Sequence, residues 1–209
     1  MSAYSSQEYP LDRCKEDFKN ILKGTKREGI EKLLKYIEQK TDFYTAPMVT
    51  ANGEDIREGA LLRYSLTVYS RLMMAFSQEN MLQEEGRRCK DEAELKRVCD
   101  SIAIIGLLHG LFMANYYQRV TCQTLNPDTA AFEEVTSVKL RDDILGYGKG
   151  EETVYILSGF LKLSRDEAFA IRFHSEDLTD ANTERVFRRS PLALMLRIAI
   201  LQTIYLDKH

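Results

Sequence analysis

The sequence predicts an all-α fold, a helical bundle that carries one small β-hairpin. Apolar residues recur at the spacing of a helix along most of the 209 residues. Helix-start signals precede two of these stretches, and one segment alone, Arg119–Leu140, alternates between apolar and polar residues as a strand does. Because 44% of the residues are hydrophobic, one full core is expected, and residues 1–209 are predicted to form a single domain.

Two amphipathic helices are predicted near the start of the chain. The first, Asp12–Leu22, buries Phe18 and is ended by Gly24. The second, Glu28–Gln39, carries a continuous apolar stripe. The stripe consists of Ile30, Leu33, Leu34 and Ile37, at positions i, i+3, i+4 and i+7.

A long helix and a buried central helix are predicted next. Thr41–Glu54 is predicted to be a loop, because it contains a proline and an Asn-Gly pair. Asp55–Gln78 is predicted to be helical, with Leu62, Leu66, Tyr69, Met73 and Phe76 facing inward. The charge-rich Asn80–Arg97 fits a solvated loop and the exposed start of the next helix. Glu94–Tyr117 is predicted to be the central helix, and its apolar run Ile102–Met113 is too short to span a bilayer.

The C-terminal half contains the hairpin and three further predicted helices. Arg119–Leu140 is predicted to form the hairpin, with a turn at Asn126-Pro127-Asp128. Glu151–Leu163 is predicted to be helical. Ser164 and Glu167 form a capping box at the start of the predicted helix Arg165–Phe173. A proline in the first turn opens the last helix, Pro191–Leu206.

Charge and cysteine usage exclude several classes of protein. A net charge of −3 argues against a generally basic nucleic-acid binder, and we expect neither a nucleic-acid partner nor a membrane partner. The four cysteines have no CxxC spacing and are interpreted as free thiols. The N-terminus has no apolar segment typical of a secretory signal, so a cytoplasmic protein is expected.

Five further segments and the run IAIIGLLHGLFM, at Ile102–Met113, resemble one bacterial and phage family of HD-domain phosphohydrolases. The five are TDFYTAP (Thr41–Pro47), EGALLRYSLTVYSRL (Glu58–Leu72), GYGKGEETVYIL (Gly146–Leu157), AIRFH (Ala170–His174) and PLALMLRIAILQTIYL (Pro191–Leu206). They occur in the order and at the spacings of that family. The resemblance covers residues 33–206, and it leaves residues 1–24 as an N-terminal helical extension. It implies an HD-domain-like helical bundle.

The resemblance also implies that most of the family's metal ligands are missing. Of the six positions that hold ligands in the family, only His109 and His174 keep a ligating side chain. The other four are occupied by Tyr64, Gly110, Lys149 and Ile200. Divalent metals in such sites need carboxylates, and an HD hydrolase needs the metal to activate water. We therefore expect no metal, no cofactor and no catalytic residue.

The residues that remain suggest a binding pocket that has lost its chemistry. Lysine and arginine can take over the metal's role in binding phosphate, although not its activation of water. Beside Lys149, Arg197 lies one helical turn before Ile200, and Arg63 precedes a ligand position. The predicted ligand-binding residues are Tyr64, His109, Lys149, His174, Arg197 and Arg63. The expected partner is a small phosphorylated, nucleotide-like molecule, held without hydrolysis.

The family's frequency in phages suggests the sharpest form of this hypothesis, a sponge for a nucleotide immune signal in the host cytoplasm. Three alternatives stay open. In the first, the pocket no longer binds a ligand and Asn80–Arg97 binds a protein. In the second, the chain is a residual hydrolase that uses His109, His174 and carboxylates not yet recognised. In the third, the site has decayed, and His109 is a hydrogen-bonded core residue. The ligand's identity and the oligomeric state are also left open, a homo-oligomer being one option.

Overall fold

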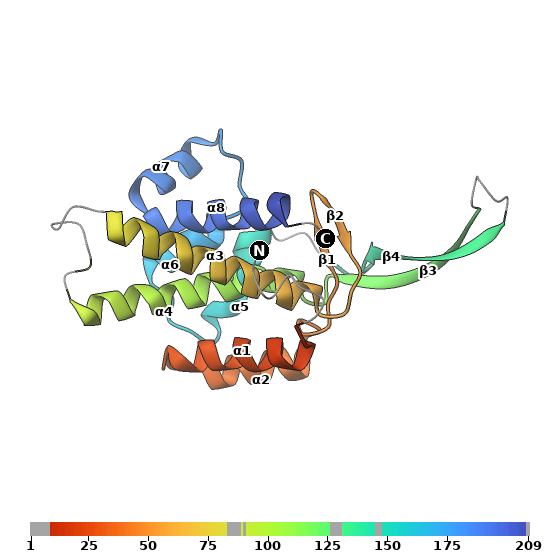
Figure 1. The fold of residues 1–209 in the computed structure, drawn as a ribbon, viewed down its shortest axis with the longest axis horizontal. Coiled ribbons are helices and arrows are strands. Elements are labelled where there is room, and N and C mark those ends of the chain that lie inside the picture. Colours follow the sequence, from red (N-terminus) through yellow and green to blue (C-terminus); the bar gives the residue numbers. More distant parts are fainter. Residues whose placement is uncertain (1–8, 83–88, 90, 126–130, 145–147, 208–209) are drawn as a thin grey trace.

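The computed structural model describes residues 9–82, 89, 91–125, 131–144 and 148–207 (Figure 1). Helices make up more than half of these residues, so the predicted mostly helical fold is confirmed. The α-helices are α1 (Leu11–Gly24), α2 (Ile30–Lys40), α3 (Ala60–Leu82), α4 (Glu92–Leu108), α5 (Lys149–Ser158), α6 (Arg165–Phe173), α7 (Ala181–Arg189) and α8 (Pro191–Leu206). A short 3-10 helix, η2 (Leu111–Met113), follows α4, and the strands are β1 (Met48–Thr50), β2 (Gly53–Asp55), β3 (Tyr117–Leu125) and β4 (Phe132–Leu140).

The long helix α3 lies in the middle of the helical body and packs most extensively against α4 and α8 (Figure 1). Helices α1 and α2 cover one side of this layer, and α7 lies over α8 on the other. Gly106 allows α3 and α4 to approach closely, since a Cβ atom at this position would lie 2.9 Å from the Cα of Tyr69. The packing of α3 against α4 therefore requires glycine at 106.

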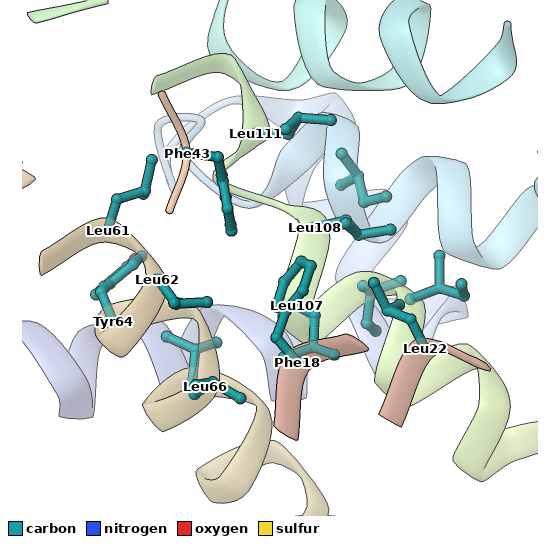
Figure 2. Packing of buried hydrophobic residues seen from close by; sticks show 14 of the residues in the cluster. Phe18, Leu22, Phe43, Leu61, Leu62, Tyr64, Leu66, Leu107, Leu108 and Leu111 are labelled. Atoms are coloured by element: carbon teal, nitrogen blue, oxygen red, sulfur yellow. The ribbon is translucent and has the colours of Figure 1, made fainter. Parts of the chain in front are cut away.

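One cluster of buried side chains joins the helices (Figure 2). Phe18 of α1 and Phe43 are both fully buried, and their rings lie 5.2 Å apart. Leu62 and Leu66 of α3 and Leu107 of α4 belong to the same cluster. The apolar run at 102–113 is buried throughout, as predicted. The core thus surrounds the point where α4 ends, which is also where the predicted site lies.

The predicted hairpin is confirmed, and it projects from the helical body (Figure 1). Nine antiparallel pairs join β3 to β4, from Tyr117–Leu140 to Leu125–Phe132, and the predicted turn at 126–128 lies outside the described residues. Arg119 anchors the base, because its guanidinium donates to the carbonyl oxygens of Thr45, Ile56 and Arg57 at 2.8–3.0 Å.

Two predicted element types were wrong. The predicted loop Thr41–Glu54 contains strand β1 and the start of β2, so the described chain has two hairpins rather than one. The central helix does not reach Tyr117, since α4 ends at Leu108. Asn115 adopts a positive φ of 61° and exchanges hydrogen bonds with Asp42 at 2.6 and 2.9 Å, which turns the chain into β3. An all-apolar segment hides such a break, because periodicity requires polar residues in order to be visible.

Other boundaries moved by a few residues. The long helix begins at Ala60 rather than Asp55, and α5 ends at Ser158 rather than Leu163. The capping box of Ser164 and Glu167 is present, and helix α6 has the predicted bounds. Helix α7 was not predicted. Its only large apolar residues are Val186 and Phe187, which are too few to show a repeated helical spacing in the sequence.

Candidate functional site

Three rings from three helices meet in the core. Tyr64 comes from α3, His109 follows the last residue of α4, and His174 follows the last residue of α6. The ring centroids of His109 lie 5.4 Å from those of both Tyr64 and His174, and the two imidazoles meet edge to face. All three side chains are buried, and His109 has no exposed surface. The structure thus brings together three of the six predicted ligand-binding residues.

Hydrogen bonds define the protonation of both histidines. The Nδ1 atom of His109 lies 3.0 Å from the carbonyl oxygen of Gly106, and that of His174 lies 2.6 Å from the carbonyl oxygen of Ile171. A carbonyl oxygen only accepts, so each Nδ1 carries the proton. In a neutral ring, the Nε2 of His109 is then an acceptor, and the hydroxyl of Tyr64 donates to it at 3.3 Å.

Burial keeps both imidazoles neutral. The pKa of His109 is lowered to about 3, chiefly by loss of solvation and in part by the neighbouring His174. The pKa of His174 is lowered to about 4, again chiefly by loss of solvation; the hydrogen bond to Ile171 opposes this effect, and the positive charges of Arg197 and Lys149 add to it. Burial likewise raises the pKa of the Tyr64 phenol. At neutral pH the three rings are therefore uncharged.

Two cationic side chains stand beside the rings. Arg197 of α8 is half-buried, and its guanidinium donates a short hydrogen bond to the carbonyl oxygen of His174. Its Nε atom is buried and has no partner among the described residues. Lys149, the first residue of α5, is exposed to solvent, and its charge acts on His174. These two residues form the cationic rim of the histidine cluster.

Arg63 is placed differently from the other predicted residues. Its guanidinium donates to the carbonyl oxygen of Tyr9 at 2.7 Å, so it holds the start of the described chain against α3. Arg63 and Tyr64 also line a small cavity of about 20 Å³. A volume of this size holds a water molecule and no larger ligand.

The positions that the family fills with carboxylates are buried and apolar here. Ile200 is 4% exposed. A Cβ atom at Gly110 would lie 2.9 Å from the Cε of Met113 and 3.9 Å from the hydroxyl oxygen of Ser65. That hydroxyl is buried without a partner among the described residues. Ser65 was not singled out from the sequence, although it lies within the quoted segment EGALLRYSLTVYSRL.

The donor set does not fit an HD metal centre. Within the ranges that the structure describes, no group of three or more His, Cys, Asp and Glu side chains is arranged to hold a metal ion. His109 packs against both His174 and Tyr64, and no carboxylate among the described residues joins the two histidines in place of those missing at 110 and 200. We therefore derive no step through a metal. A ligand reaches this cluster only at its rim, unless the buried rings move.

No protein-family model, curated protein or solved structure matches this chain. The resemblance to the HD-domain family therefore remains a prediction from the quoted segments. No helix among the described residues is long and apolar enough to cross a membrane.

Proposed function

We propose that this chain is a catalytically inactive, HD-like protein that binds a phosphorylated, nucleotide-type ligand without hydrolysing it. The observation that carries the proposal is a pair of cations, Lys149 and Arg197, beside two histidines that have lost the carboxylates of the resembled site. Lys149 and Arg197 lie at the rim, while Gly110 and Ile200 are buried where the resemblance implies aspartates. A phosphate is held by such cations, but water is not activated by them.

The unpartnered hydroxyl of Ser65 supports descent from a site with a side chain at position 110. Buried hydroxyl groups almost always have hydrogen-bond partners in folded proteins. Ser65 has none among the described residues, and its oxygen lies 3.9 Å from the place where a Cβ atom at Gly110 would be. A carboxylate at 110 would accept from this hydroxyl. The orphaned group is what the loss of such a side chain leaves behind.

The rim offers a phosphate one exposed cation, Lys149, and one half-buried cation, Arg197. Lys149 is the first residue of α5, and the backbone N–H groups of this turn favour negative charge, part of which Glu151 and Glu152 already supply. Arg197 keeps an unpartnered Nε. A ligand bound here and released intact is sequestered. The proposed role against host immune signalling rests only on the resemblance to phage proteins.

Calorimetry with a panel of linear, cyclic and ADP-ribose-type nucleotides, with and without manganese, tests the proposal. We expect micromolar binding without metal, and recovery of the intact nucleotide after denaturation. Lys149→Ala should weaken binding about 10- to 150-fold, as expected for loss of one charge-assisted contact. Lys35→Ala is the matched control, because Lys35 is an exposed lysine on α2. Equal binding by both variants, or no binding at all, rejects the proposal, and metal-dependent product formation supports a residual hydrolase.

A protein-interaction scaffold is the second candidate, and the projecting hairpin favours it. Leu125, Phe132 and Val135 are 52%, 73% and 43% exposed on strands that extend away from the helical body (Figure 1). The surface predicted for this role, 80–97, lies largely outside the described residues or in the exposed first turns of α4. A scaffold shows no thermal stabilisation by any nucleotide, whereas a binding protein does.

A further inference from the structure

A second cavity lies between α6 and α7 and extends to Ser190, the residue before α8; Tyr64, His109 and His174 do not line it. Its volume is about 810 Å³, which suits a small organic ligand. We call it the arginine–phenyl cavity. Four arginines and two phenylalanines give it this name: Arg165, Arg172, Arg185, Arg189, Phe169 and Phe173.

The arginines of α7 are the cavity's available cations. Arg185 and Arg189 are four residues apart on α7 and so share one face of the helix. Both are exposed, and within the described part of the chain neither makes a hydrogen bond or an ion pair. Arg165 lies on the opposite wall, at the start of α6. An anion that entered the cavity would meet arginines from two helices.

Two of the cavity's three carboxylates are already engaged. Glu176 accepts from Arg172 at 2.8 Å. Asp180 caps α7, since it accepts from the backbone N–H groups of Asn182 and Thr183 at 3.0 and 2.9 Å. The lining carries four arginines and three carboxylates, a net charge of +1. Arg185 and Arg189, both on α7, lack a hydrogen bond or ion pair within the described residues, so they are the cations open to an anionic ligand.

The wall formed by α6 is aromatic. The rings of Phe169 and Phe173 lie 6.2 Å apart and meet at 82°. The guanidinium of Arg165 lies over the Phe169 ring at 5.2 Å from its centroid. Val186 of α7 also lines the cavity. A flat organic group can pack against this surface while an anionic group reaches the arginines.

Ser190 also lines the cavity. Ser190 is 2% exposed, and its hydroxyl makes no hydrogen bond within the described residues. It occupies the cap position of α8 but does not cap the helix. Ser164, by contrast, caps α6 through its side chain. A buried hydroxyl without a partner, lining a cavity, is suited to a hydrogen bond with a ligand.

We propose that the arginine–phenyl cavity binds an organic phosphate of about the size of a nucleoside monophosphate. Arg185 and Arg189 hold the phosphoryl group, the flat part of the ligand packs against Phe169 and Val186, and Ser190 hydrogen-bonds to a ligand oxygen. This inference does not depend on the histidine cluster.

Calorimetry with AMP as the probe tests the cavity, with UMP, adenosine and inorganic phosphate as comparison ligands. We expect AMP to bind at least tenfold more tightly than adenosine or phosphate, since each lacks one half of the contacts. Arg185→Ala/Arg189→Ala should weaken AMP binding at least tenfold, and Ser190→Ala should weaken it measurably. Arg188→Ala is the matched control, because Arg188 lies on the same helix, pairs with Glu184 and does not line the cavity.

Both substituted arginines are exposed, so the double variant should fold, which circular dichroism will verify. Any of three results overturns the inference. The first is no binding of AMP or UMP at a concentration of about 1 mM. The second is unchanged AMP binding by the double variant, and the third is an equal loss of AMP affinity in Arg188→Ala. If Lys149→Ala loses AMP binding and the double variant does not, AMP binds at the rim of the histidine cluster. That result rejects the proposed cavity site and leaves the proposed function in place.

Discussion

The imidazoles of His109 and His174 meet edge to face with their centroids 5.4 Å apart, and both are held as neutral Nδ1–H tautomers by backbone carbonyls. Two rings that enzymes of the resembled family would use as metal ligands are here closed against each other. The Nε2 of His109 accepts a hydrogen bond from the Tyr64 hydroxyl rather than facing solvent. In this structure the pair therefore serves as a polar part of the core.

Tyr64→Phe is expected to destabilise the protein by about 1–2 kcal/mol, because it leaves the Nε2 of His109 buried without a donor. Tyr44→Phe is the matched control. The Tyr44 hydroxyl is also buried but has no partner among the described residues, so its removal should be neutral or stabilising. Urea unfolding of the two variants measures both effects. Equal free energies of unfolding for the two would show that the Tyr64–His109 hydrogen bond contributes nothing.

Acid should destabilise the protein through the two histidines. Their folded pKa values of about 3 and about 4 lie below the ordinary value of 6.5, so the unfolded chain binds more protons between these limits. Stability is complete above pH 6.5 and falls as the pH drops toward 4, by about 1.4 kcal/mol per pH unit for each histidine. Chemical denaturation at several pH values between 4.5 and 7.5 measures this slope.

His174→Gln provides the control for the pH dependence, because it removes one titrating group and leaves His109. The slope between pH 5 and 6 should fall to about half of the wild-type slope. An unchanged slope would mean that His174 is already solvated and charged in the folded protein.

Arg27 and Glu167 form a second buried polar contact, and it ties the turn before α2 to α6. The guanidinium donates to both carboxylate oxygens at 2.8 and 3.1 Å, and Ser101 and the backbone of Ser164 donate as well. Desolvation alone would raise the pKa of the fully buried Glu167, but the hydrogen bonds from Arg27, Ser164 and Ser101 outweigh it and lower the pKa. The side chain of Glu167 is therefore charged in the folded protein.

Arg27→Met is expected to cost about 2–3 kcal/mol, because it leaves a buried carboxylate with fewer donors. The cost lies below that of a fully buried pair, since the side chain of Arg27 is 27% exposed. Lys19→Met removes the exposed ion pair with Glu38 and should cost less than about 0.5 kcal/mol. Thermal and urea unfolding compare the two variants, and a loss of similar size in both would contradict the assigned role of Glu167.

Local signals in the sequence predicted the fold better than long-range ones. The bounds of α6 were predicted to the residue, because Ser164 and Glu167 act across only three positions. The end of α4 was missed, because an entirely apolar stretch carries no periodicity. Helix α7 was missed for the opposite reason, since its exposed surface leaves few apolar positions. Its cap, Asp180, was nevertheless a readable start signal.

The predicted site comprised Tyr64, His109, Lys149, His174, Arg197 and Arg63. The structure brings the first two rings and that of His174 together and places Arg197 on the carbonyl oxygen of His174, whereas Arg63 binds Tyr9. No sequence pattern could indicate that the rings pack shut, because that depends on how tightly α3, α4 and α6 approach one another. The arginine–phenyl cavity was also invisible, since it needs the unpredicted α7 as a wall.

Gly110→Asp alone is expected to yield no phosphohydrolase. The new carboxyl group would enter a fully buried position, where the Ser65 hydroxyl is the donor in reach and the flexible end of Met113 must move aside. Burial disfavours the charged carboxylate, so we expect destabilisation by about 2 kcal/mol or more at pH 7 and less at pH 5.

Gly110→Ala is the matched control, because it adds only a Cβ atom against the flexible side chain of Met113. It should cost less than about 1 kcal/mol, and the difference between the two variants separates the effect of the buried charge from that of side-chain size. Release of phosphate from nucleotides with manganese should stay at background, because Tyr64, Lys149 and Ile200 still lack suitable ligating groups. Activity would require Tyr64→His, Lys149→His and Ile200→Asp as well, and metal-dependent turnover by the single variant would show that these positions are matched wrongly.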